Sequence, residues 1–196
     1  MNHTGQPSYD EFKKMLTPRN LKEIQIIYFA LGTGVVIFML VLIFTYFLVS
    51  EFVSGTDDNL IFMLTLIHLL FLLTGIPLSK FLFKKILNSA GVSTILTPAV
   101  VRKTKDSVDR SSWSLWNRIR LAHILRLALF ESIAVFGLII CTLATFSGVI
   151  KAYPIYWINL VSSFLFIMFL INNFPNAEKL QRFFMEYIQD QPLYED

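Results

Sequence analysis

Four long apolar stretches, separated by polar segments, dominate the chain. They are Ile24–Ser50, Asn59–Ser79, Leu127–Ile150 and Ala152–Ala177. An α-helix rises ~1.5 Å per residue, so about 20 apolar residues cross the hydrocarbon core of a bilayer. Within lipid the backbone must satisfy its own hydrogen bonds, which favours helices over single strands. The pattern therefore predicts an all-α polytopic membrane protein with four transmembrane helices.

The composition changes this picture little, but it excludes other classes of protein. Of the 196 residues, 55% are hydrophobic and only 16% are charged, whereas a soluble domain carries about 25% charge. A single cysteine, Cys141, excludes an internal disulfide framework and a thiolate-rich metal site. The chain has no H-E-x-x-H motif and no Gly-rich phosphate loop. We therefore expect no enzyme activity, no cofactor and no metal; a lipid-modifying enzyme is the weakest alternative.

The distribution of basic residues predicts an orientation. Lys and Arg concentrate before the first apolar stretch, between the second and third, and after the fourth. The loop between the first and second stretches has none, and the loop between the third and fourth has only Lys151. Because cytoplasmic loops are enriched in Lys and Arg, both termini are predicted to be cytoplasmic, in the cell inner membrane. The net charge of +3 comes from these basic segments. Membrane topology therefore accounts for the excess of Lys and Arg, and we expect no nucleic-acid partner.

These boundaries predict a single membrane domain over residues 1–196. A cytoplasmic N-terminal segment (1–23) precedes a first helical hairpin (24–87), and a cytoplasmic linker (88–111) leads to a second hairpin (112–177). An amphipathic cytoplasmic tail (178–196) completes the chain. Within the first segment, Thr17-Pro18 is typical of a helix N-cap followed by Pro at the first helical position.

The two hairpins also match each other in sequence. One ungapped shift of the chain places Ile26 on Ile124, Phe71 on Phe169 and Pro77 on Pro175. Leu and Phe matches are frequent in so apolar a sequence, but the coincident prolines and the absence of gaps are more specific. We interpret the match as two tandem hairpins from one ancestral unit, forming a parallel internal repeat.

The repeat carries a pair of small residues in each half. Ala30-x-x-x-Gly34 in the first helix matches Ala128-x-x-x-Ser132 in the third. Small residues four apart let helix backbones approach closely in lipid. We predict that the first and third helices meet along these faces, directly or across the pseudo-twofold axis; the alternative is that the faces contact lipid.

Glu131 and His68 are the candidates for chemistry within the spans. Glu131 lies about 12 Å along the helix from His123, where an ionised carboxylate must be neutralised, paired or hydrated. His68 is predicted at a similar depth, and a Glu–His pair could hold or relay a proton. The structural alternatives are a protonated Glu bonded to a neighbouring helix, and a hydrogen-bonded core histidine. Three asparagines, Asn159, Asn172 and Asn173, lie near the ends of the fourth stretch, where solvation is expected.

The stretch Glu131–Ile139 resembles the carboxylate helix of the proteolipid ring subunits of rotary ATPases. The resemblance implies a proton-binding Glu131 in an oligomeric ring. The resemblance covers only this stretch. Ring subunits have a glycine-studded partner helix, whereas this chain has eight glycines in total. Ring subunits also carry the carboxylate on the second helix of a hairpin, whereas Glu131 is on the first helix of its hairpin.

The second half also resembles small four-helix bacterial inner-membrane proteins of unknown function. The shared pattern is Arg126, Ala128, Leu129 and Glu131, with Pro175 and Lys179 near the end of the last helix. This resemblance implies no activity.

Together these features favour an inner-membrane interaction or assembly module, such as a subunit of a larger membrane complex. Its expected partners are the lipid bilayer and other membrane subunits or further copies of itself. The alternative is a small proton- or ion-coupled transporter that uses Glu131 and His68.

Overall fold

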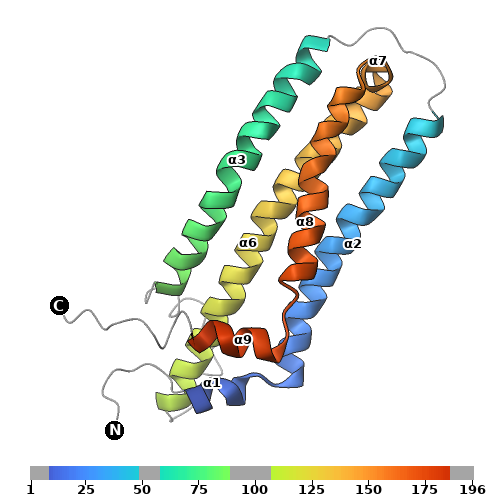
Figure 1. Ribbon diagram of the computed structural model, residues 1–196. Coiled ribbons are helices and arrows are strands. Elements are labelled where there is room, and N and C mark those ends of the chain that lie inside the picture. The colour runs from blue at the N-terminus through green and yellow to red at the C-terminus, as the bar shows by residue number, and fades with distance from the viewer. Residues whose placement is uncertain (1–8, 49–57, 89–106, 186–196) are drawn as a thin grey trace. The chain divides into compact units, whose positions relative to one another are not determined.

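A computed structural model describes residues 9–48, 58–88 and 107–185 of the chain (Figure 1). Most of the predicted linker 88–111, and residues 186–196 of the predicted tail, lie outside the described residues. The described part is helical throughout its regular elements. These are α1 (Tyr9–Met15), α2 (Pro18–Leu48), α3 (Asp58–Asn88), α6 (Ser107–Phe146), α7 (Val149–Ala152), the 3₁₀ helix η1 (Pro154–Leu160), α8 (Val161–Asn172) and α9 (Ala177–Phe184).

Four of these helical segments are long and apolar enough to cross a membrane. They are Pro18–Leu48, Asp58–Ile86, Leu115–Phe146 and Pro154–Asn172. The prediction of an all-α chain with four such helices is confirmed, because each helix has the hydropathy and about the ~20-residue length that a span needs. The orientation across the membrane stays a prediction.

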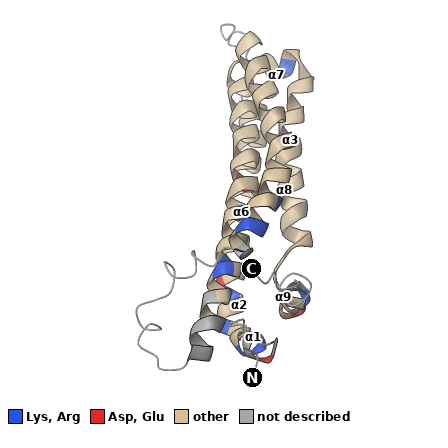
Figure 2. Ribbon diagram, turned by 90° about the vertical axis from the view of Figure 1, so that its left-hand side faces the viewer, with Lys and Arg blue, Asp and Glu red and all other residues tan. Residues whose placement is uncertain are grey.

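The chain divides into two compact units. Unit 1 comprises residues 1–27, 84–123 and 174–196, and unit 2 comprises Tyr28–Phe83 and Ile124–Asn173. The helices α2, α3 and α6 contribute residues to both. Charged residues colour much of the unit 1 elements α1 and α9, whereas the helices of unit 2 carry few (Figure 2).

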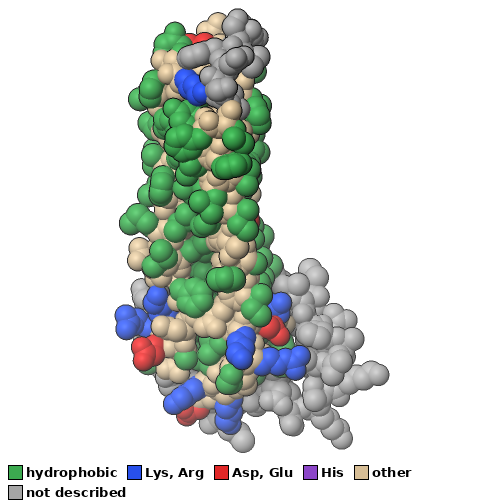
Figure 3. Space-filling view, turned by 90° about the vertical axis from the view of Figure 1, so that its right-hand side faces the viewer, with side chains coloured by type: hydrophobic (Ala, Val, Ile, Leu, Met, Phe, Trp, Pro, Cys, Tyr) green, Lys and Arg blue, Asp and Glu red, His purple; other side chains and the backbone are tan. Residues whose placement is uncertain are grey.

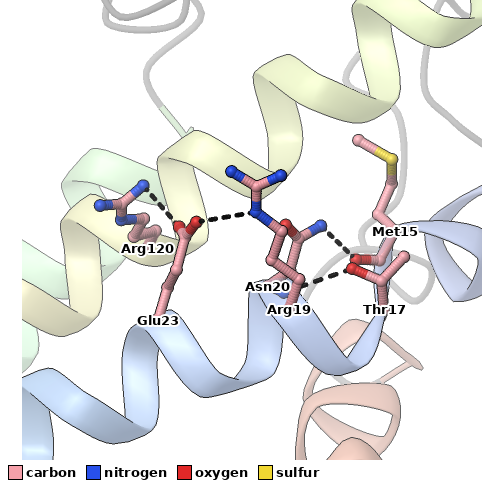
Figure 4. Close-up of polar contacts among 6 residues, drawn as sticks. All are labelled: Met15, Thr17, Arg19, Asn20, Glu23 and Arg120. Atoms are coloured by element: carbon pink, nitrogen blue, oxygen red, sulfur yellow. Dashed lines mark hydrogen bonds and ion pairs between the residues drawn. The ribbon is translucent and has the colours of Figure 1, made fainter.

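Unit 1 shows why α2 begins where the sequence predicts. Thr17 caps the helix: its Oγ1 accepts a hydrogen bond from the backbone N–H of Asn20 at 3.3 Å, and Pro18 is the first helical residue. The Glu23 carboxylate lies 3.1 Å from Arg120 of α6 and 3.9 Å from Arg19 (Figure 4). These ion pairs are partly exposed, so each contributes only about 0–1 kcal/mol to stability.

The C-terminal helix α9 is separate from the fourth span. The span ends at Asn172, earlier than the predicted Ala177, because Pro175 disfavours the helical conformation for the residue before it. Asn176 then caps α9, with its side chain accepting from the Lys179 N–H at 2.7 Å. Within unit 1, the Gln25 side chain of α2 donates to the Pro175 carbonyl at 2.9 Å.

Unit 2 is built around α6 and the fourth span. Phe130 of α6 stacks on Phe169 of α8 with ring centroids 4.6 Å apart. The ring centroids of Phe71 on α3 and Phe136 on α6 are 5.8 Å apart. On α2, Gly32 faces α8, where an added Cβ would lie 2.9 Å from Leu170. Over the most apolar 18 residues of each span, 44% are buried in α6 and 39% in η1–α8, against 22% in α2 and in α3. α2 and α3 therefore flank a central pair.

The outer surface of the unit 2 helices is apolar. Phe29, Phe47 and Leu73 are each more than 70% exposed, at 72%, 76% and 73%. Hydrophobic side chains cover the helices on the face seen in Figure 3. Apolar patches of this extent are rare on soluble monomers, so the surface suits a lipid environment.

The two hairpins differ at the elements that the repeat aligns. Pro77 lies inside the continuous helix α3, whereas its counterpart Pro175 lies beyond the end of α8. The fourth span begins as a 3₁₀ helix, and the second is α-helical throughout. The equivalence of the two hairpins therefore stays a prediction.

Candidate functional site

The first turn of the fourth span is positioned by a tight connection from α6. Gly148 adopts φ 72° between α6 and α7, a left-handed conformation that favours glycine. Pro154 then begins η1, consistent with its fixed φ and missing N–H. The 3₁₀ turn carries Asn159 into the interior of unit 2, where this side chain is fully buried.

Four polar side chains meet there, and we call them the His68 cluster: His68 and Thr65 of α3, Asn159 of η1 and Ser162 of α8. His68 Nδ1 lies 2.8 Å from Asn159 Oδ1, and His68 Nε2 lies 3.0 Å from Ser162 Oγ. His68 and Asn159 have 0% exposure, and Ser162 and Thr65 have 3% and 7%. Buried polar groups are costly unless they are hydrogen bonded, and here each side chain has a partner.

The network fixes the orientation of the Asn159 amide. The Thr65 hydroxyl donates its single hydrogen to the Ile61 carbonyl at 2.8 Å, so it accepts from Asn159 Nδ2 at 3.0 Å. The second amide hydrogen goes to the Tyr156 carbonyl at 3.0 Å. The Asn159 oxygen must therefore face His68, and the pattern of partners assigns a proton to His68 Nδ1.

The Ser162 hydroxyl has a choice of acceptors. Its oxygen lies 3.0 Å from His68 Nε2 and 3.1 Å from the Asn159 main-chain carbonyl. With a neutral ring, Ser162 donates to Nε2. With a doubly protonated ring, Nε2 donates to Ser162, and Ser162 donates to the carbonyl. Rotation of one hydroxyl thus lets the cluster hold the ring in either protonation state.

Glycine at position 137 is required for this close approach. A Cβ on Gly137 of α6 would collide with the Asn159 carbonyl oxygen, and it would lie 2.7 Å from Ser162 Oγ and 2.9 Å from His68 Cε1. His68 also contacts the Phe136 ring edge-on, with centroids 5.9 Å apart. The cluster is therefore enclosed on the α6 side by backbone and an aromatic ring.

Further polar contacts tie the same helices together. Ser163 of α8 donates to the Ala134 carbonyl of α6 at 3.2 Å. The Tyr156 hydroxyl of η1 donates to Asp58, the first residue of α3, at 2.7 Å. Cys141 is buried, and its sulfur lies 3.7 Å from the Tyr156 carbonyl. The fourth span is thus joined to α3 and α6 by side chains from three successive turns.

Glu131 is not part of this network. Both ring nitrogens of His68 have other partners, so the Glu131–His68 pair expected from depth alone does not form. The reason is helix rotation: Phe130 faces α8, and the next residue points ~100° away around the helix. Glu131 is half-buried, and no residue in the described ranges forms a hydrogen bond or ion pair with it.

The small residues also face outward. Ala30, Gly34, Ala128 and Ser132 are all exposed, and a Cβ on Gly34 would meet nothing within 4 Å. The expectation that α2 and α6 meet directly along these faces is therefore wrong within one chain. α2 instead turns larger residues inward, namely Tyr28, Val35 and Leu42. Contact with a second chain along these faces stays a prediction.

Asn159 is the residue that sequence reasoning missed. Its position near the start of the fourth apolar stretch suggested solvation, yet the structure buries it completely. The available signal was the run of polar residues Asn159, Ser162 and Ser163 at helical spacing, which marks an inward polar face.

The described residues contain no group of three His, Cys, Asp or Glu side chains that could hold a metal ion. Comparison with protein-family models, curated proteins and solved structures gives no match. The function is therefore argued from the geometry of the chain itself.

Proposed function

We propose that the chain is a multi-pass inner-membrane protein, with both termini cytoplasmic, that serves as an interaction or assembly module. Its contact surface is the face of α6 formed by Ala128, Glu131 and Ser132, which we call the Glu131 face. The observation that carries the proposal is the Glu131 carboxyl, half-buried in an apolar span and without a partner among the described residues.

The energetic argument starts from the cost of that carboxyl. A charged side chain costs on the order of 2.5–3.5 kcal/mol at the centre of a membrane helix on insertion scales, and less toward the interface. Glu131 lies about 7.5 Å along α6 from Arg126, on the side toward the centre. Such residues are normally paired or hydrated, and the described residues provide no pair. A polar group on a second membrane chain would lower this cost, whereas lipid tails would not.

The neighbours of Glu131 suit the approach of another helix. Ala128 lies three residues before Glu131 and four before Ser132, so its side chain lies between theirs on one side of α6. Both small residues are exposed, and the Ser132 hydroxyl is already bonded to the Ala128 carbonyl at 2.7 Å. Close backbone packing, with Glu131 as the polar contact, is the usual chemistry of helix association in lipid.

The test is self-association or co-purification from native membranes in mild detergent. Ala128→Leu should disperse the assembly, because its larger side chain holds the partner helix away. Glu131→Gln should retain it, because the amide still forms hydrogen bonds. Thr74→Leu is the matched control: Thr74 is exposed on α3, at about the same distance from the outer helix end as Ala128.

Single-molecule photobleaching in native membranes gives the stoichiometry directly. A protein that is monomeric at every density, with no co-purifying membrane subunit, would overturn the proposal. So would an Ala128→Leu variant that assembles as well as Thr74→Leu does.

Proton- or ion-coupled transport is the second candidate, and the His68 cluster favours it because it can hold the ring in both protonation states. Reconstituted liposomes with an internal pH dye distinguish the two functions. Transport through Glu131 requires that Glu131→Gln abolishes proton flux while the assembly stays intact. If the chain is an assembly module, neither the wild type nor Glu131→Gln gives proton flux above that of empty liposomes.

A further inference from the structure

A cavity of about 330 Å³ lies between α3, α6 and α8 in unit 2. This volume is at the lower end of the ~300–1,000 Å³ typical of ligand pockets. Its walls are mostly apolar, and they include Leu72, Ile76, Phe130, Ile133, Leu165 and Met168.

Four of the five polar residues that line the cavity gather at one end, and Ser162 of α8 lies at the other. The four are Lys80 of α3, Arg126 of α6, Asn172 at the end of α8 and its C-cap Asn173. Contacts between Phe83 and Arg126 and between His68 and Phe136 show that α3 and α6 run antiparallel. The Phe130–Phe169 and Ala134–Ser163 contacts show the same for α6 and α8. Each helix therefore places one of these four polar residues, or its cap, at the same end. A mostly apolar wall extends about 10–15 Å beyond that end.

The charge of this end has one sign. The lining contains two cations, Lys80 and Arg126, and no acidic residue. The Arg126 guanidinium lies 4.7 Å from the centroid of the Phe169 ring and 5.3 Å from that of Phe83. These cation–π contacts hold its position. The cavity thus joins a fixed positive end to an apolar groove, which is the complement of an amphiphilic anion.

The depth of the cations fits a lipid headgroup. Lys80 lies about 33 Å along α3 from Asp58, and Arg126 lies about 30 Å along α6 from Phe146. The hydrocarbon core is ~30 Å thick, so both cations reach the opposite interface from these helix ends. In the orientation proposed above, that interface is the cytoplasmic one, where anionic lipids attract basic side chains.

We propose that this cavity binds an anionic phospholipid of the cytoplasmic leaflet. Lys80 and Arg126 contact its phosphate, and one acyl chain lies along the apolar wall between α6 and α8. The site does not depend on the assembly role proposed above, because all its residues come from one chain.

Native mass spectrometry of the detergent-purified protein tests this. The probes are dioleoyl phosphatidylglycerol and dioleoyl phosphatidylcholine, added at equal concentration. The wild type should retain phosphatidylglycerol preferentially. Lys80→Gln should reduce that preference about fivefold, from the ~1 kcal/mol that a basic residue contributes near anionic lipid. Lys84→Gln is the matched control, since Lys84 is exposed on the same helix but does not line the cavity.

A second variant tests the groove without changing charge. Met168→Trp should fill the cavity and reduce retention of both lipids, whereas Met63→Trp, at an exposed position outside the lining, should not. Circular dichroism and elution volume verify that each variant is folded.

Three outcomes would overturn the proposal. The first is equal retention of the two lipids by the wild type. The second is an equal loss in Lys84→Gln, which would indicate general surface attraction. The third is displacement of the lipid by millimolar inorganic phosphate alone, which would indicate a site for the anion and not for the lipid.

Discussion

The His68 cluster and Glu131 are both polar features of the apolar helices of unit 2, yet their surroundings are opposite. Each side chain of the cluster is buried and has hydrogen-bond partners from neighbouring helices. Glu131 is half-buried on an outward face, and the described residues give it no hydrogen bond or ion pair. Polarity within a membrane span therefore has two separate consequences. An inward, satisfied group joins the helices of one chain, whereas an outward, unsatisfied group favours contact with another.

The largest effect is expected where the cluster is most crowded. Gly137→Ala should lower the free energy of unfolding by about 3 kcal/mol, at the upper part of the range for overpacked cores. The reason is that the new methyl group meets the Asn159 carbonyl, a backbone atom that cannot move without shifting η1. Unfolding by SDS titration in dodecylmaltoside, followed by circular dichroism, measures the change.

Gly34→Ala is the control for that substitution. A methyl group there meets no atom within 4 Å, so the unfolding free energy should stay the same or rise by up to ~1 kcal/mol through better helix propensity. An equal change in the two variants would mean that Gly137→Ala acts only through helix propensity and not through closeness to the cluster.

A smaller effect separates the two polar features directly. Asn159→Leu should cost about 2 kcal/mol, because it leaves the buried Nδ1–H of His68 without an acceptor. Glu131→Leu should cost less than ~0.5 kcal/mol in the monomer, because no contact within the described chain is lost. The same SDS titration, at a detergent concentration that keeps the protein monomeric, compares them. A larger loss for Glu131→Leu would show that the carboxyl stabilises the chain itself.

The sequence predicts the spans well and the cluster poorly, for a physical reason. A span depends on local composition: Ile24–Ser50 carries no charged residue, and lipid requires such a segment to be helical. The partner of His68 depends on how α3 and the fourth span are rotated about their axes, and the two partners are far apart in the chain. Depth along the membrane normal alone suggested Glu131, because depth is readable from residue number and rotation is not.

The ends of the elements show the same division. Thr17 and Pro18 mark the start of α2 because capping is a local interaction. The outward position of Ala30 and Gly34 was not readable, since small residues suit both a helix contact and a lipid surface. The 3₁₀ start of the fourth span was not predicted either, although Pro154 was its local signal.

The smallest effect concerns a single hydroxyl in the cluster. Thr65→Val keeps the shape of the side chain but removes the acceptor of one Asn159 amide hydrogen. The other amide hydrogen still reaches the Tyr156 carbonyl, so we expect a loss of about 0.6 kcal/mol, the average for hydrogen bonds between membrane helices. Thr74→Val is the matched control, because the Thr74 hydroxyl is exposed and donates only within its own helix, to Leu70 at 2.8 Å and Phe71 at 3.5 Å.

A double-mutant cycle shows whether this loss belongs to the cluster. In the Asn159→Leu background the Thr65 hydroxyl has no amide to accept from. Thr65→Val should then cause no further loss of unfolding free energy, just as Thr74→Val should cause none. If Thr65→Val costs the same in both backgrounds, its hydroxyl stabilises α3 through Ile61 alone. The hydrogen bond between Thr65 and Asn159 would then contribute nothing to stability, and the contrast between the His68 cluster and Glu131 would be weaker.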